Sequence, residues 1–179
     1  LTGASKEALQ TADIILMPQK GSDKSDLAGL RRHICERVLK KQPRFAEFDL
    51  PKRDRNQPDY LKSVDTWHAE IANIWLETLN KELPGGGAAA LMIWGDPSLY
   101  DSSLRIAERL KSRVKSLTVK VTPGLTSIQL LTAAHRITLN EIGAPVMIST
   151  GRQLREKGWP AGCNTCLLYT SDAADDRIC

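Results

Sequence analysis

The stretch from Ala88 to Tyr100, Ala-Ala-Ala-Leu-Met-Ile-Trp-Gly-Asp-Pro-Ser-Leu-Tyr, decides the fold. Its first part is apolar at every position, which favours a strand buried on both faces, as in a parallel sheet. The run stops at Gly95-Asp96-Pro97, where glycine widens the choice of backbone angles and proline stiffens the turn. An amphipathic helix pattern begins directly afterwards, at Asp101–Leu110. The stretch predicts a tight loop at the carboxyl end of a strand, which is where open α/β sheets bind ligands.

A second unit of the same kind lies further along the chain. Leu117–Val121 is predicted as a strand, Thr122–Ser127 as a loop containing Pro123-Gly124, and Ile128–Ala134 as a helix. One Gly-Asp-Pro turn alone favours an ordinary strand-to-helix connection. Two such loops, the second with hydroxyls at a helix start, favour a nucleotide-like pocket in an α/β domain.

The remaining pattern alternates strands with helices, which predicts a parallel, wound sheet. Helices are expected at Ser5–Ala12, Lys24–Lys40 and Pro58–Glu82, strands at Asp13–Met17, Phe45–Leu50 and Val146–Thr150, and a short basic helix or loop at Gly151–Lys157. Pro18 is expected to end its strand. The predicted inner faces of the two long helices are Leu27, Leu30, Ile34, Val38 and Leu39, and then Leu61, Val64, Trp67, His68, Ile71, Ile74, Trp75 and Leu79.

Between two of these elements lies a proline-bracketed loop, Pro51–Pro58, that is dense in charge. It is compatible with plain solvated surface. Its guanidiniums at Arg53 and Arg55 could also bind carboxylates, because the planar fork of arginine bonds them in pairs.

Composition narrows the function classes. The net charge of +4 and pI near 8.9 fit an anionic small molecule and are too mild to argue for nucleic acid. No apolar stretch approaches a bilayer span, and the start lacks a secretory pattern. Cys163 and Cys166 have Cys-x-x-Cys spacing but no second pair or nearby histidine, so no metal site is predicted. We expect a cytoplasmic protein with reduced thiols.

The two loops, Trp94–Tyr100 and Thr122–Ser127, resemble those of the tetrapyrrole methylase family, whose members carry Gly-Asp-Pro-x-x-Tyr/Phe and Pro-Gly-x-Ser/Thr-Ser/Ala in the first of two α/β domains. The resemblance implies an N-terminal α/β domain at residues 1–140, with its first strand absent, and the start of a truncated second α/β domain at 141–165. Residues 166–179 resemble a translated sequencing adapter and are interpreted as a non-native tail. We expect such a fragment to be inactive.

The resemblance also implies a chemistry. The cofactor would be S-adenosylmethionine, and its contacts would be Trp94, Gly95, Asp96, Leu99, Thr126 and Ser127. The substrate would be an anionic tetrapyrrole, gripped by Arg53, Arg55 and Tyr100. The implied reaction methylates C-1 of the corrin precursor precorrin-5 and releases its acetyl group as acetate. No general base is assigned, although His68, His135 and Tyr100 are titratable groups near motif positions. The intact protein would be a homodimer.

Two other hypotheses remain open at this point. An enzyme of the same fold could act on ribosomal RNA or a translation factor. Alternatively, both loops could be mere turns in a nucleotide-binding domain without enzymatic activity.

Overall fold

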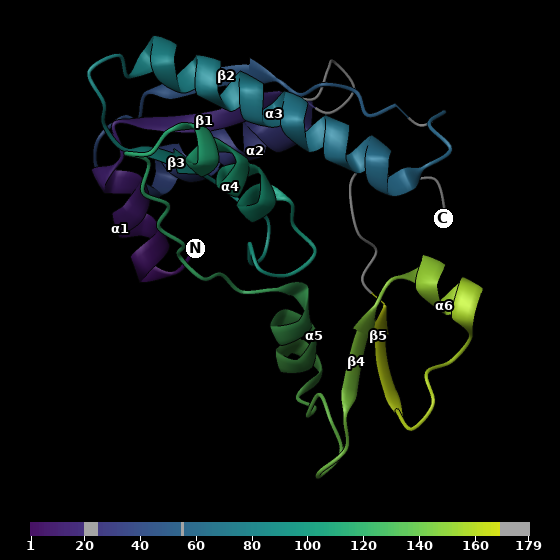
Figure 1. Cartoon of the computed structure of the whole chain (residues 1–179). Helices are drawn as coiled ribbons and strands as arrows, with labels where there is room; N and C mark the ends of the chain where they lie inside the picture. The colour runs from purple at the N-terminus through teal and green to yellow at the C-terminus, as the bar shows by residue number, and fades with distance from the viewer. Residues whose placement is uncertain (20–24, 55, 169–179) are drawn as a thin grey trace.

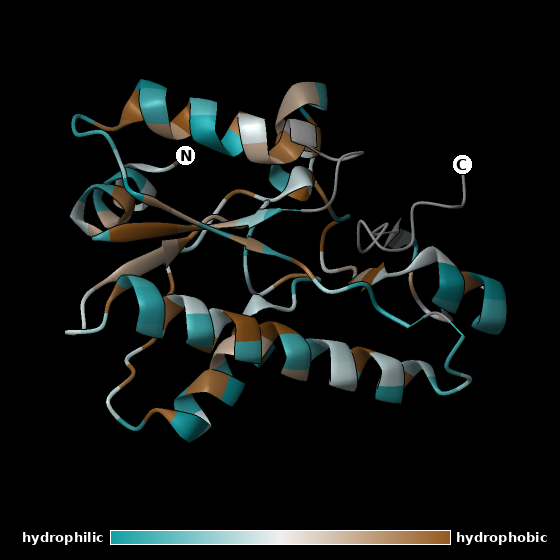
Figure 2. Ribbon diagram, turned by 90° about the horizontal axis from the view of Figure 1, so that it is seen from above, coloured by the Kyte–Doolittle hydropathy of each residue, from teal (hydrophilic) through white to brown (hydrophobic). Residues whose placement is uncertain are grey.

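The computed structural model describes residues 1–19, 25–54 and 56–168. A three-stranded parallel sheet with the order β2-β1-β3 lies between helices on both of its faces (Figures 1 and 2). A separate two-stranded parallel sheet, β4-β5, follows. The predicted α/β class with a parallel sheet is confirmed.

The elements have the following bounds: α1 Gly3–Thr11, β1 Ile14–Gln19, α2 Ser25–Val38, β2 Phe45–Asp49, α3 Tyr60–Glu82, β3 Ala89–Leu91, α4 Ser103–Arg113, α5 Ser127–His135, β4 Val146–Ser149, α6 Gly151–Lys157 and β5 Thr165–Leu168.

Strand β1 lies at the centre of the larger sheet, with β2 and β3 hydrogen-bonded on either side. Its residues Ile14 to Met17 are all buried. Ile14 and Leu16 pack toward α3 and α4, whereas Ile15 packs toward α1 and α2, because successive side chains of a strand point to opposite faces. The apolar run before Gly95 was predicted to be a strand buried on both faces; a strand forms there at Ala89–Leu91, but the predicted burial is wrong, because Ala89 is exposed and the next two residues are half-buried. Strand β3 has three residues, and among the described strands its one ladder partner is β1.

Pro18 does not end β1, contrary to the prediction, and it pairs with Phe48 of β2. In β1, the Ile15 N–H donates to Arg44 O and the Gln19 carbonyl accepts from Leu50 N. Odd-numbered residues therefore direct their backbone groups toward β2, and Pro18 directs its nitrogen toward β3. Pairing with β3 has already ended at Leu16–Leu91. The N–H that proline lacks would have had no ladder partner, so the strand tolerates it.

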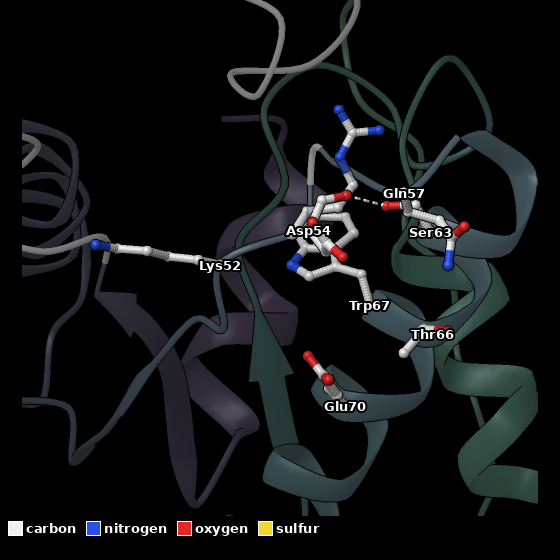
Figure 3. Close-up of a pocket in the computed structure, with 8 residues that line it drawn as sticks. Lys52, Asp54, Gln57, Ser63, Thr66, Trp67 and Glu70 are labelled. Carbon is white, nitrogen blue, oxygen red and sulfur yellow. Dashed lines mark hydrogen bonds between the residues drawn. The ribbon is translucent and has the colours of Figure 1, made fainter. Parts of the chain in front are cut away.

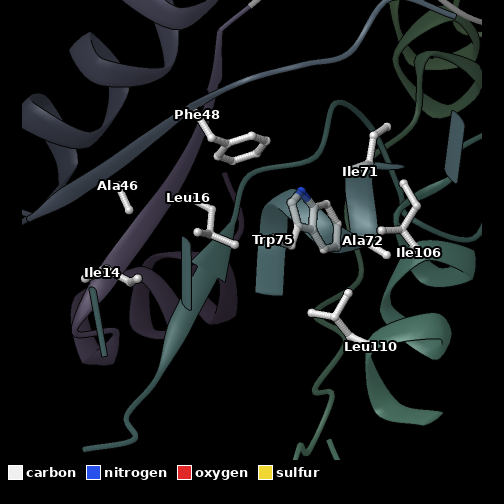
Figure 4. Packing of buried hydrophobic residues seen from close by; sticks show 9 residues of the cluster. All are labelled: Ile14, Leu16, Ala46, Phe48, Ile71, Ala72, Trp75, Ile106 and Leu110. Carbon is white, nitrogen blue, oxygen red and sulfur yellow. The ribbon is translucent and has the colours of Figure 1, made fainter. Parts of the chain in front are cut away.

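The main hydrophobic core joins the sheet to α3 and α4 (Figure 4). Its buried members are Ile14, Leu16, Ala46, Phe48, Ile71, Ala72, Trp75, Ile106 and Leu110. Each large apolar side chain buried here contributes about 1.5–3 kcal/mol relative to exposure. On the predicted inner face of α3, Ile71 and Trp75 are buried, but Leu61 is 76% exposed. Leu61 lies in the first turn, beyond the reach of the sheet.

The inner face of α2 also differs from the prediction. Leu27 and Leu30 are exposed, and Ala28 and Cys35 are buried instead. Cys35 packs with Leu9 and Ile15, and its thiol lies 3.4 Å from the Met92 sulfur.

The strand predicted at Leu117–Val121 does not form. In the described part of the chain this segment has no ladder partner, and Val119 and Val121 are exposed. The helix that follows it, α5, forms as expected but buries none of its residues.

The end of the described chain contains β4, α6 and β5, so the predicted strand at 146–150 is confirmed, and of the two alternatives at 151–157, helix or loop, the helix forms. The Tyr100 hydroxyl donates to the Ile148 carbonyl (3.1 Å), which links this part to the first. Cys166 to Leu168, in the segment interpreted as a non-native tail, belong to β5, and residues 169–179 lie outside the described residues. The domain boundary at 140/141 and the origin of that tail stay predictions.

Candidate functional site

The loop after β3 has a sharply turned backbone. Gly95 has φ +78° and Tyr100 has φ +49°, both in the left-handed region. Between them the Asp96 carboxylate folds back onto its own loop: its Oδ1 accepts from the Ser98 N–H at 2.9 Å and from the Ser98 hydroxyl. These bonds hold the carboxylate in one orientation.

The same carboxylate reaches the second loop. Asp96 Oδ2 accepts a hydrogen bond from the Gly124 N–H at 2.8 Å, across 28 positions of sequence. A Cβ added at Gly124 would lie 2.1 Å from the Gly95 carbonyl oxygen, so the two backbones touch directly at the two glycines. The two loops identified from the sequence are therefore in contact, and the hydrogen bond from Gly124 to Asp96 joins them.

This arrangement changes the acidity of Asp96. The hydrogen bonds from the Ser98 hydroxyl, the Gly124 N–H and the Ser98 N–H lower the pKa of the Asp96 carboxyl below its usual value, because they stabilise the ionised form. The group is an anion at neutral pH. Three of its roughly four acceptor positions are occupied within the protein.

The start of α5 carries the two hydroxyl residues of the second loop. Thr126 is buried, its hydroxyl donates to the Gln129 side-chain carbonyl, and its N–H donates to the same oxygen at 2.9 Å. Ser127 is exposed. Thr126 thus fixes the first turn of the helix, and the Ser127 hydroxyl is open to a ligand.

An aromatic residue flanks the first loop. Trp94 is 46% exposed, and the guanidinium of Arg31 from α2 lies over its ring at 5.0 Å. The Arg31 Nε is buried and has no hydrogen-bond partner among the residues that the structure describes. This burial lowers the pKa of Arg31 from its usual value. An accessible indole face and a cation therefore lie beside the Gly95–Asp96 turn.

The charged loop at residues 51–58 forms a second polar region. A hollow of about 110 Å³ is lined by Lys52, Arg53, Asp54, Gln57, Ser63, Thr66, Trp67 and Glu70 (Figure 3). The Trp67 indole N–H donates to Pro51 O at 2.8 Å and fixes the base of the loop on α3. The Arg53 guanidinium carbon lies 5.0 Å from the Tyr60 ring centroid, and that of Arg152, from α6, lies 4.3 Å from it.

Comparison with known proteins identifies this architecture. The sequence pattern described as Tetrapyrrole (Corrin/Porphyrin) Methylases matches residues 1–176. The chain belongs to this family. The predicted membership of a family of methyltransferases is confirmed.

Individual relatives agree with this membership. The chain is 48% identical over 180 residues to a precorrin-6A synthase (deacetylating) from a Sinorhizobium species, covering 99% of this chain and 69% of that protein. It is similar to the crystal structure of a cobalamin synthesis related protein (CobF) from Corynebacterium diphtheriae, with a TM-score of 0.70 and 37% identity over 93% of this chain and 64% of that one. The fold is also shared with the cobalt precorrin-4 methyltransferase CbiF, at a TM-score of 0.50 and 18% identity over 84% of this chain and 51% of that one.

The residues predicted to bind ligands are only partly together in this tetrapyrrole methylase chain. Trp94, Gly95, Asp96 and Leu99 share one loop, which contacts the loop leading to Thr126 and Ser127 through Gly124. Arg53 belongs to the separate polar hollow, Tyr100 contacts β4, and Arg55 lies outside the described residues.

The titratable groups named from the sequence are also apart. His68 is buried in α3, with its ring 5.6 Å from that of Trp67, and His135 is exposed at the last turn of α5. Within the described residues, no group of three or more His, Cys, Asp or Glu side chains could hold a metal ion. None of the helices that the structure describes is long and apolar enough to cross a membrane.

Sequence reasoning did not select Gly124, which bonds to Asp96, or Arg152, which stacks on Tyr60. The sequence does carry a signal for each, since Gly124 lies in a loop after a predicted strand and Arg152 lies at a helix start after β4, the position where open α/β sheets bind ligands. Arg31 and Tyr60 had no such signal, because each occupies an ordinary helical position.

Proposed function

We propose that this chain belongs to an S-adenosylmethionine-dependent C-methyltransferase of corrin biosynthesis, which methylates precorrin-5 at C-1 and releases acetate to give precorrin-6A. The observation that carries the proposal is the contact between the two motif loops, tied by Asp96 and Gly124. The 48% identity to a precorrin-6A synthase supports this particular reaction within the family.

The residues at the loops fit the methyl donor in three respects. The Gly95–Gly124 contact leaves no room for a side chain, so backbone amides can approach a ligand closely. Trp94 and Leu125 expose apolar surface suited to a nucleoside. The Ser127 hydroxyl is accessible to the polar tail of an amino acid.

The bound donor would supply an electrophilic methyl group on a sulfonium. The chain itself would hold the methyl group of the donor and the reacting carbon of the substrate in line. Such positioning lowers the activation barrier of a reaction between two bound molecules by a large amount. Asp96 acts as an organiser in this proposal: its internal bonds hold both loops in register, and one acceptor position remains for a ligand. Arg53, Tyr100 and the undescribed Arg55 are proposed to contact the anionic substrate.

We further propose that the intact enzyme is a cytoplasmic homodimer that uses neither nucleic acid nor a membrane as a partner. The modest net charge of +4 supports a small anionic substrate over an RNA.

Isothermal calorimetry with S-adenosylhomocysteine tests the donor site. We expect saturable binding to a full-length relative carrying this core, and weaker binding when Asp96 is replaced by alanine. Methyl transfer to precorrin-5 with one acetate released per turnover would establish the reaction. Absence of binding heat and of any thermal shift would contradict the proposal, and methylation of ribosomal RNA instead of the corrin precursor would reassign the substrate.

A further inference from the structure

Two arginines far apart in the sequence meet at one aromatic ring. Arg53 lies in the loop after β2, Arg152 lies on α6, and Tyr60 between them is the first residue of α3. The guanidinium carbons are 5.0 and 4.3 Å from the ring centroid, so they are no further apart than the sum of these distances. Two like charges are brought together here by separate parts of the chain.

The aromatic ring explains how these charges are tolerated. The face of an aromatic ring is electron-rich and attracts cations, and arginine can stack on it while its N–H groups still point outward. Within the described part of the chain, the contact shown for Arg152 is with this ring, and no carboxylate of that part forms an ion pair with it. The nearby Asp59 and Asp54 accept bonds from the backbone N–H groups of Lys62 and Asn56.

The cluster is connected to the methyl-donor loops through Tyr100. Tyr100 closes the loop that carries Asp96, and its hydroxyl donates to Ile148 O in β4. Strand β4 leads directly into α6, which carries Arg152. A ligand bound by both arginines would therefore lie between two features. Arg152 belongs to the helix that follows β4, which contacts the donor loop through Tyr100, and Arg53 lines the polar hollow.

We propose that Arg152 and Arg53, supported by Tyr60, form a clamp for the peripheral carboxylates of the tetrapyrrole substrate, with one arginine supplied by each part of the chain. This inference rests on the proposed function and assigns Arg152 and Tyr60 a role in substrate specificity. Carboxylates suit the clamp because the planar guanidinium of arginine matches a carboxylate in shape and charge and, as at the exposed Arg152, can donate two parallel hydrogen bonds to it.

Fluorescence titration of the full-length protein with uroporphyrin, which bears eight carboxylates, tests the clamp. We expect Arg152→Gln to weaken uroporphyrin binding about tenfold or more, the usual loss for one charge-assisted bond. Arg152→Lys should restore part of the affinity, because it keeps the charge without the planar fork. Tyr60→Leu should also weaken binding, whereas Tyr60→Phe should retain it.

Lys157→Gln is the matched control, because Lys157 is an exposed cation on the same helix and lies outside the cluster. It should leave uroporphyrin binding unchanged. Affinity for S-adenosylhomocysteine should stay within twofold in every variant. Equal affinity for uroporphyrin in wild type and Arg152→Gln, or a loss of equal size in Lys157→Gln, would overturn the clamp.

The two proposals fail in different ways. If S-adenosylhomocysteine does not bind the wild type, the proposed function fails, and the porphyrin titration still decides the clamp. If S-adenosylhomocysteine binds the wild type but Arg152→Gln leaves the affinity for uroporphyrin unchanged, the clamp alone is refuted.

Discussion

At the scale of single residues, the Asp96 carboxylate holds the two motif loops together through its hydrogen bonds. Two of its hydrogen bonds stay inside its own loop and the third crosses to Gly124. A neutral side chain of the same shape would keep part of this pattern but lose the charge that strengthens each bond. Its ionisation state should therefore control how firmly the loops are joined.

The pH dependence of stability tests this role. The lowered pKa of Asp96 means that the folded state prefers the ionised form more than the unfolded chain does. The resulting stabilisation is complete above the ordinary aspartate range and is lost as pH falls through the folded pKa. The difference in unfolding free energy between wild type and Asp96→Asn should be constant above about pH 5 and shrink below about pH 4. A difference that grows on acidification would contradict it.

Gly124 offers a steric test at the same scale. A methyl group there would meet the Gly95 carbonyl oxygen, so Gly124→Ala should lower the free energy of unfolding by about 1–3 kcal/mol and weaken binding of S-adenosylhomocysteine. Gly29→Ala is the control: Gly29 is exposed within α2 and a Cβ there meets no atom within 4 Å. It should raise stability by about 0.5–1 kcal/mol. Urea denaturation measures both, and equal effects would exclude the close contact.

At the scale of elements, α3 ties the sheet to the rest of the core. Ile71→Ala should cost about 2–5 kcal/mol, because Ile71 is 2% exposed among tightly packed neighbours. Leu61→Ala on the same helix should change stability by about 0.5 kcal/mol or less, since Leu61 is 76% exposed. Chemical denaturation of both variants checks this, and a large loss at Leu61 would mean that the first turn packs against something further.

The elements also show how far pattern alone could lead. Helical periodicity correctly predicted α3 and α4, because each presents a distinct apolar face, whereas the basic stretch of α6 left helix or loop open. It could not predict that Ala28 and Cys35 of α2 are buried while Leu27 and Leu30 are exposed, because the face that a helix buries depends on how it docks on its neighbours. The apolar run before Gly95 predicted a strand but not its neighbours, since strand order is set by pairing across the chain.

The site was predictable to a similar extent. The Pro-Gly and Gly-Asp-Pro spacings identified the two loops that touch. They did not reveal that Asp96 is bonded mainly within the protein or that Thr126 is buried, because both depend on partners such as Gln129 and Gly124 in three dimensions. The meeting of Arg53 and Arg152 at Tyr60 depends on two segments separated by most of the chain.

At the scale of the whole molecule, stability should be uneven. Strand β1 has hydrogen-bonded neighbours on both sides and packed helices on both faces. Within the described residues, β4 and β5 pair with each other and with no further strand, and Met147 and Ile148 are exposed. Amide hydrogen exchange followed by mass spectrometry should show the slowest exchange at Ile14–Met17 and exchange at least tenfold faster at Val146–Ser149. Equal protection of the two strands would indicate one cooperative unit.

Pro18 has an effect beyond its own strand. In the ladder between β1 and β3, the Ile14 N–H donates to the Ala88 carbonyl. If the same register continued beyond Leu16, the backbone nitrogen of residue 18 would have to donate a hydrogen bond to the Met92 carbonyl. Proline has no such proton. The ladder between β1 and β3 stops one rung short of this position, and the chain then turns away from the sheet toward Gly95 and Asp96. The tertiary amide of Pro18 therefore stands level with the point at which the chain departs from the sheet, and it offers no donor that would hold the chain back.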